Sequence, residues 1–247
     1  MIDLRHHLMP DGRRIAFRYS TGTQPALVFL PGYMSDMEGG KATAVMDWAR
    51  RNGRACLLLD YSGCGASEGD FADGTLSRWT GEVLALIEVN PIDQVTLIGS
   101  SMGGWLMLLV GLALGDRLAG MIGIASAPDF TEWGRDDAAK RRLAAGETVF
   151  DDNPYGPEPT PMHPGFWQDG QNNRLLDSNI AIDCPVRLLH GQRDADVPWD
   201  ISMRLAKALR SDAVQVMLVK DGDHRLSREQ DVALLLRTVA SLSDVPL

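Results

Sequence analysis

The sequence predicts an α/β fold with a mostly parallel central sheet and helices on both faces. Strand-like apolar runs alternate with helix-like segments along most of the 247 residues, which is typical of strands joined by crossover helices. A second observation is the apolar run at residues 95–98, which passes through a glycine-serine turn into a helix-like apolar run at residues 105–114. Because ligands bind beyond the carboxyl ends of the strands in such sheets, we expect functional residues in the loops that follow strands.

Local composition and spacing predict the individual elements. Residues 26–30 and 55–59 are short continuous apolar runs, as in strands that are buried on both faces. In residues 75–89, by contrast, Leu76 and Val83 belong to an apolar set at helical spacing. In chain order, strands are expected at residues 15–19, 26–30, 55–59, 95–101, 118–126, 186–189 and 214–219, and helices at residues 41–51, 75–89, 105–114, 132–147 and 225–242.

One segment, residues 127–183, is too long for an ordinary connection. We interpret the whole chain, residues 1–247, as one domain in which this insertion forms a small cap over the functional site. The cap carries Trp133, Phe166 and Trp167, which would either line an apolar binding pocket or simply anchor the cap to the core.

Residues 99–103, Gly-Ser-Ser-Met-Gly, are the most informative motif in the chain. A G-x-S-x-G sequence between a strand and a helix is typical of a nucleophile elbow, a turn so tight that the serine backbone is strained. Gly99 and Gly103 would let the strand and the helix pass without a clash. A chance glycine-serine turn would have no reason to lie between two such apolar runs. The motif therefore predicts an exposed, nucleophilic Ser101.

A serine nucleophile needs a general base, and the base needs a carboxylate that orients it. Asp194 follows the strand-like run at residues 186–189, and Asp196 lies two positions further on as the alternative acid. His224 follows the last expected strand and is the only histidine after the acid, in the order Ser, acid, His that elbows of this type use. His190 begins the turn that carries Asp194, so it is too close in sequence to serve as the base.

Acyl transfer also needs N–H donors for the oxyanion that develops on the substrate. One expected donor is the backbone N–H of Met102, the residue after the nucleophile. The other is the backbone N–H of Tyr33, because the Pro31-Gly32 turn after the strand at residues 26–30 permits a close backbone approach. An ordinary Pro-Gly turn is the alternative interpretation.

Four stretches resemble a known family: FLPGYMSDM at residues 29–37, DYSGCGAS at residues 60–67, GSSMGGWLM at residues 99–107 and RLLHG at residues 187–191. They resemble the α/β-hydrolase superfamily, and within it the subgroup of mitochondrial acyl-protein thioesterases, also called mycophenolic acid acyl-glucuronide esterases, with their bacterial relatives. The Asp-His pair at His224 fits as well, and the resemblance favours Asp194 over Asp196 as the acid. Many superfamily members carry His-Gly where this chain has Pro31-Gly32, a departure that keeps the backbone donor.

The resemblance implies a serine hydrolase of carboxylic esters or thioesters, with an S-acyl protein, an acyl thioester or an acyl glucuronide as substrate. This chemistry needs neither a cofactor nor a metal. Three alternatives stay open: a peptidase or amidase on the same residues, an acyltransferase that excludes water, and a binding protein that keeps the fold without catalysis. The oligomeric state is not predicted.

The composition limits which classes of binding partner and which cellular compartment we expect. The net charge of −9 argues against nucleic acids and anionic membranes as partners, since both need a basic surface. The longest apolar stretch, residues 105–114, is too short to span a bilayer, and residues 1–7 contain no apolar signal segment. The three cysteines are an odd, sparse set, which favours a reducing compartment. A cytoplasmic location is therefore expected.

Overall fold

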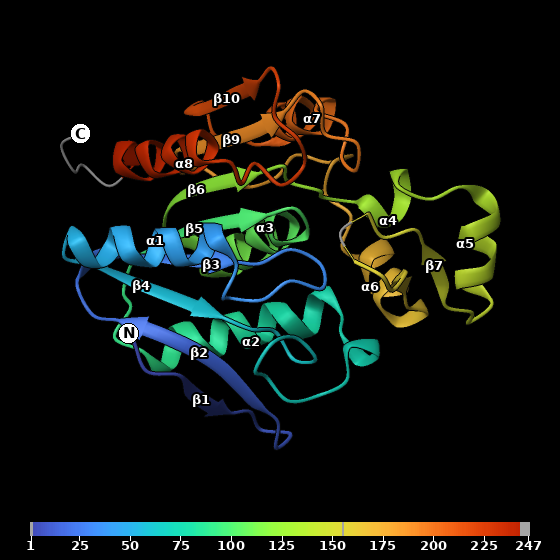
Figure 1. Cartoon of the computed structure of the whole chain (residues 1–247), viewed down its shortest axis with the longest axis horizontal. Coiled ribbons are helices and arrows are strands. Elements are labelled where there is room, and N and C mark those ends of the chain that lie inside the picture. Colours follow the sequence, from blue (N-terminus) through green and yellow to red (C-terminus); the bar gives the residue numbers. More distant parts are fainter. Residues whose placement is uncertain (1, 155, 243–247) are drawn as a thin grey trace.

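The computed structural model describes residues 2–154 and 156–242, and within them a central sheet of eight strands (Figure 1). Its spatial order is β1–β2–β4–β3–β5–β6–β9–β10. The strands are β1 (Arg5–Leu8), β2 (Arg14–Ser20), β3 (Thr23–Leu30), β4 (Arg54–Leu59), β5 (Val95–Ser100), β6 (Leu118–Ile124), β9 (Val186–Gly191) and β10 (Val214–Val219). Only the pairs β1–β2 and β2–β4 are antiparallel, so the predicted mostly parallel sheet is confirmed.

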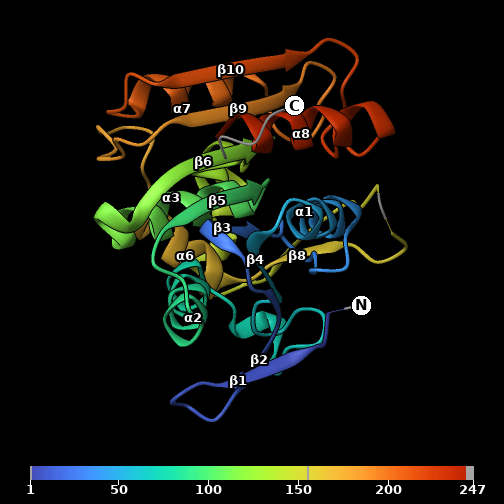
Figure 2. The ribbon, with the colours of Figure 1, turned by 90° about the vertical axis from the view of Figure 1, so that its left-hand side faces the viewer.

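Helices cover both faces of this sheet, as predicted (Figure 2). One face carries α1 (Gly40–Arg51) and α8 (Glu229–Leu242), and the other carries α2 (Leu76–Val89), α3 (Met102–Leu114) and α7 (Asp200–Ala208). Every residue of β4 is buried because both of its faces are covered, which explains its uninterrupted apolar sequence. Two short 3₁₀ turns, η1 (Phe71–Asp73) and η2 (Gly115–Arg117), complete the connections.

The segment between β6 and β9 lies beyond the carboxyl ends of the parallel strands (Figure 1). It contains α4 (Phe130–Trp133), α5 (Asp137–Ala144), β7 (Val149–Asp151), β8 (Thr160–Met162) and α6 (Pro164–Asn172). β7 and β8 pair as a separate antiparallel ribbon. Phe166 of α6 is buried in the same apolar cluster as Trp79 of α2, so this segment packs directly on the main body.

Local capping shortens two of the expected helices. The helix expected at residues 132–147 is split, since α4 ends at Trp133 and Asp136 starts α5 by accepting a hydrogen bond from the Ala139 N–H at 2.7 Å. The helix expected from residue 225 begins only at Glu229. Just before it, the backbone N–H of Arg228 donates to the Asp231 carboxylate at 3.2 Å. β1 and α7 were not predicted: β1 is a short, largely exposed edge strand, and α7 buries only a narrow face.

Candidate active site

Ser101 lies at the junction between β5 and α3, in the turn that the G-x-S-x-G motif predicts. Its backbone has φ 55° and ψ −120°, a region that a residue with a side chain adopts only under strain. The two flanking glycines make the turn possible. A Cβ on Gly99 would overlap the Gly103 carbonyl, and a Cβ on Gly103 would overlap the Leu30 carbonyl. The strained turn therefore exists because both positions lack side chains.

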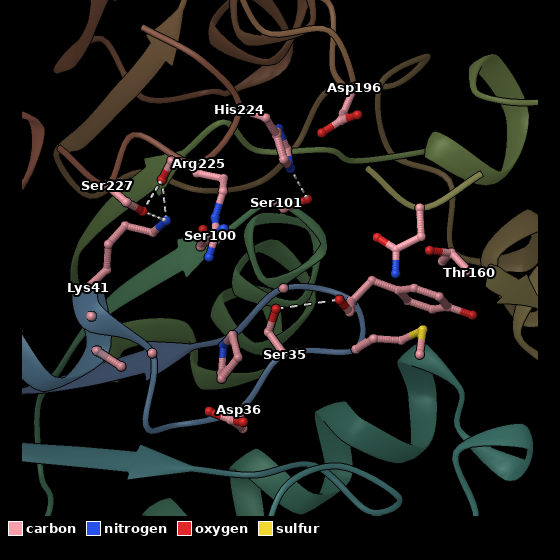
Figure 3. A pocket seen from close by; sticks show the side chains of 18 of the residues that line it. Ser35, Asp36, Lys41, Ser100, Ser101, Thr160, Asp196, His224, Arg225 and Ser227 are labelled. Atoms are coloured by element: carbon pink, nitrogen blue, oxygen red, sulfur yellow. Dashed lines mark hydrogen bonds between the residues drawn. The ribbon is translucent and has the colours of Figure 1, made fainter. Parts of the chain in front are cut away.

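A chain of two hydrogen bonds joins Ser101, His224 and Asp194 (Figure 3 shows the first of them). The Ser101 Oγ lies 3.0 Å from Nε2 of His224, and Nδ1 of His224 lies 2.8 Å from Oδ2 of Asp194. Because a carboxylate only accepts, Nδ1 carries the hydrogen and Nε2 is left to accept the serine proton. The structure thus brings together three side chains that are 30 and 123 positions apart in sequence.

Asp194 is a fully buried carboxylate in the loop after β9. Its Oδ1 accepts hydrogen bonds from the N–H groups of Asp196 and Val197, at 2.9 and 2.8 Å. Burial alone would raise the pKa of Asp194, but hydrogen bonds from His190 and His224 outweigh it and hold that pKa below its usual value. Asp196, the alternative acid, is exposed and lies on the wall of the pocket beside His224 (Figure 3).

The two expected oxyanion donors flank Ser101. Met102 is the first residue of α3, where a backbone N–H has no acceptor within its own helix. The loop with Tyr33 passes close to the nucleophile, since a Cβ on Gly32 would lie 3.4 Å from Cβ of Ser101. The side chain of Tyr33 is also engaged: its hydroxyl donates to the Pro161 carbonyl at 2.9 Å, across to the β6–β9 segment.

A cavity of about 550 Å³ opens onto Ser101 and His224 (Figure 3). Its size is within the usual range for small-molecule sites. The described residues that line it are Phe29, residues 31–36, residues 39–42, Ser100, Ser101, residues 151–154, Thr160, Asp196, His224, Arg225 and Ser227. The walls therefore come both from the loop after β3 and from the β7–β8 ribbon.

None of the three aromatic residues expected in the cap is among the described residues that line this cavity. Phe166 is buried against Tyr33, with ring centroids 5.0 Å apart. The indole N–H groups of Trp133 and Trp167 donate to the carbonyls of Pro128 and Thr131. The contacts of all three are those of the anchoring alternative.

Lys41 and His190 are two charged or titratable groups near the site whose contacts were not predicted from the sequence. Lys41 donates to the carbonyl of Arg225, next to His224, and burial lowers its pKa to about 8. At the start of an amphipathic helix, Lys41 looks in sequence like any surface lysine. His190 contacts Asp194, with its Nε2 3.1 Å from Oδ2. Its position at the start of the Asp194 turn is a sequence signal for this contact, although not for the role of general base.

One group of described residues has the spacing of metal ligands: Asp194, Asp196 and His224, with ligand atoms within 4.8 Å of one another. Two of these residues already bond to each other through Nδ1 and Oδ2. Asp194 also accepts from the Asp196 N–H, so its own hydrogen bonds account for the proximity of all three residues.

Comparison with known proteins identifies the family and the fold. A model of the alpha/beta hydrolase family matches residues 27–238. The human protein named palmitoyl-protein thioesterase ABHD10, mitochondrial, is 35% identical over 239 residues, which cover 95% of this chain and 78% of the relative. A solved structure of mouse alpha/beta hydrolase domain-containing protein 10 superposes with a TM-score of 0.91 at 33% identity, covering 98% of both chains. A hydrolase structure from Agrobacterium vitis S4 gives 0.90 at 37% identity, over 98% of this chain and 99% of that one. These matches confirm the predicted resemblance.

The comparisons also correct one expectation. The expected cytoplasmic location is wrong, because the curated relatives from Homo sapiens and Mus musculus are named as mitochondrial proteins. The cysteine content could not distinguish a cytoplasmic from a mitochondrial location, since free thiols persist in any reducing compartment. Among the described residues, no helix has the length and apolar character to cross a membrane.

Proposed function

Because the chain belongs to the alpha/beta hydrolase family, we propose that it is a serine hydrolase that cleaves carboxylic esters or thioesters. Ser101 is the nucleophile, His224 the general base and acid, and Asp194 the carboxylate that orients His224. The observation that carries this proposal is the continuous hydrogen-bonded chain from Ser101 Oγ through His224 to the buried Asp194 carboxylate.

In the acylation step, Oγ of Ser101 attacks the acyl carbon while Nε2 of His224 takes the serine proton. The C=O electron pair moves onto the carbonyl oxygen, which accepts hydrogen bonds from the N–H groups of Tyr33 and Met102. When the tetrahedral centre collapses, the bond to the leaving oxygen or sulfur breaks, and His224 returns the proton to that atom. Asp194 stabilises the imidazolium that exists between these two transfers.

Water completes the cycle by the same route. Nε2 of His224 removes a proton from a water molecule, whose oxygen attacks the acyl-enzyme and forms a second tetrahedral centre. Its collapse breaks the bond between the acyl carbon and Oγ of Ser101, His224 returns the proton to Oγ, and the carboxylic acid leaves. Every step uses water and groups of this chain, and the hydrogen bond from Nδ1 to Asp194 orients His224 for both halves of the cycle.

We further propose that the substrate is an acyl thioester, with an S-acyl protein as the preferred class. Support comes from the relatives named palmitoyl-protein thioesterase, at 35% identity over 95% of this chain. The cavity is bounded on one side by Asp151, Asn153 and Thr160 of the β6–β9 segment. In the proposal this segment is the cap, so its β7–β8 ribbon contacts the acyl or leaving group.

Hydrolysis of matched substrates tests the proposal. We would measure p-nitrophenyl esters from acetate to palmitate beside the corresponding acyl thioesters, with wild type and Ser101→Ala. We expect turnover that depends on Ser101 and a higher kcat/KM for thioesters than for esters of the same acyl chain. Turnover that persists in Ser101→Ala would refute the role of the serine. Equal rates for both substrate types would refute the thioester preference alone.

A further inference from the structure

His190 is a buried titratable group beside Asp194 that the proposed mechanism does not use. It belongs to β9 and its side chain is fully buried. Its Nδ1 lies 2.7 Å from the hydroxyl of Ser202 on α7, and its Nε2 lies 3.0 Å from the Val197 carbonyl. The same Nε2 lies 3.1 Å from Oδ2 of Asp194, the oxygen that also faces His224.

These neighbours determine which nitrogen of His190 carries the hydrogen. A carbonyl and a carboxylate can only accept, so Nε2 must be the donor on that side. The Ser202 hydroxyl can donate to Nδ1. A hydrogen on Nε2 therefore donates to the Val197 carbonyl and lies beside Oδ2 of Asp194, while Nδ1 is left to accept from the Ser202 hydroxyl.

Polar hydrogens face both oxygens of Asp194. Its Oδ1 accepts from two backbone N–H groups, while its Oδ2 accepts from Nδ1 of His224 and also lies 3.1 Å from Nε2 of His190. A buried carboxylate remains charged only when such donors compensate for the lost water. Without His190, His224 would be the one side chain that holds Oδ2 of Asp194 in position. Because the His224 ring can rotate about its own side-chain bonds, it would hold that oxygen less firmly.

We propose that His190 is a positioning residue that holds Oδ2 of Asp194 in place, so that the ionised carboxylate keeps Nδ1 of His224 aligned. The kinetic consequence of this arrangement rests on the proposed function, while the hydrogen-bond arrangement itself does not. His190 acts only through Asp194, so its loss should affect the chemical step more than substrate binding.

Two substitutions separate donation from packing. Gln at position 190 places an amide N–H near the position of Nε2–H, whereas Leu fills the space without a donor. With p-nitrophenyl butyrate as the probe, we expect His190→Leu to lower kcat by about 10- to 100-fold, the scale of one hydrogen bond to a charged group, with KM changed by less than about 2-fold. We expect His190→Gln to stay within about 3-fold of wild type. Equal losses in both variants, or wild-type kcat in His190→Leu, would overturn the proposal.

Nitrogen-15 NMR of the wild-type protein tests the arrangement without a substrate and without a change in activity as the readout. We expect the His190 signal, assigned by its absence in His190→Gln, to show the hydrogen on Nε2. A hydrogen on Nδ1 of the neutral ring would overturn the proposal, because Nε2 could then not donate to Asp194. If the wild type hydrolysed no ester or thioester, the proposed function would fail while this measurement still decided the position of the hydrogen.

Discussion

Replacing Asp194 by Asn tests the hydrogen-bonded chain most directly, because the structure dictates how the new amide must lie. The backbone N–H groups of Asp196 and Val197 both point at Oδ1. An amide that turned its NH₂ towards them would set one donor against two, so the Asn oxygen must take this side. On the other side, the Nε2–H of His190 keeps the Val197 carbonyl as its acceptor. The NH₂ group then faces Nδ1 of His224 at the place of Oδ2, 2.8 Å away.

That orientation reverses the polarity of His224. Nδ1 must accept from the amide, so the hydrogen moves to Nε2, which can no longer accept the Ser101 proton. A carboxylate-to-amide change in an analogous triad lowers kcat by roughly 10⁴-fold. We expect a loss of this size here, about 5 kcal/mol of transition-state stabilisation. The fold should persist, since Asn occupies nearly the volume of Asp.

The assay is kcat for a p-nitrophenyl ester, together with the rate of labelling by a fluorophosphonate and a thermal melt. Asp183→Asn is a matched control, because Asp183 is exposed, pairs with Arg210 and precedes β9, at the end of the strand opposite to the loop with Asp194. It should leave kcat unchanged. A folded Asp194→Asn protein with kcat within tenfold of wild type would refute the reasoning. Loss of activity in Asp196→Asn alone would show that the acid is Asp196.

Three further predictions concern the elbow and Lys41. Ser101→Gly should be inactive but melt about 2 °C higher than Ser101→Ala, since glycine relieves the strain at φ 55°; an equal or lower melting temperature would contradict the strain. Gly103→Ala should lower the free energy of unfolding by about 3 kcal/mol in a denaturant titration, because its Cβ would overlap the Leu30 carbonyl. The control Gly81→Ala has open space around its Cβ and should be neutral or stabilising. Burial lowers the pKa of Lys41 to about 8, so between pH 8 and 10 the unfolded chain binds more protons than the folded protein. The free energy of unfolding of wild type, relative to that of Lys41→Met, should therefore rise with pH over this range, and a constant difference would refute the shift.

Local sequence sufficed for the elements that carry the site. The elbow at Ser101 could be predicted because its constraints are all local: a strand, a helix, and two glycines that the turn itself requires. The loops with Asp194 and His224 could be predicted because each follows an apolar run, and parallel strands bring their carboxyl ends to one edge. The choice of Asp194 over Asp196 came from family resemblance and not from periodicity.

Local sequence patterns could not predict contacts between segments that lie far apart in the chain. Phe166 is an aromatic residue in a long insertion, and nothing near it in sequence distinguishes a cavity wall from a packing anchor. Its position depends on Tyr33 and Trp79, which belong to other parts of the chain. The short edge strand β1 was not predicted, because it buries too little apolar surface to produce a recognisable pattern in the sequence.

The amino-acid sequence alone specified an α/β fold, a strained serine turn, and an acid and a histidine in the expected order, because these depend on neighbours in the chain and on the handed, parallel packing of strands. Packing in three dimensions decided which side chains line the cavity, that Lys41 donates to the carbonyl of Arg225, 184 positions away, and that His190 is the second histidine on Asp194. The physical reason is that a hydrogen bond requires a partner within about 3 Å in the right direction. Spacing along the sequence sets that geometry only within a single turn, helix or strand.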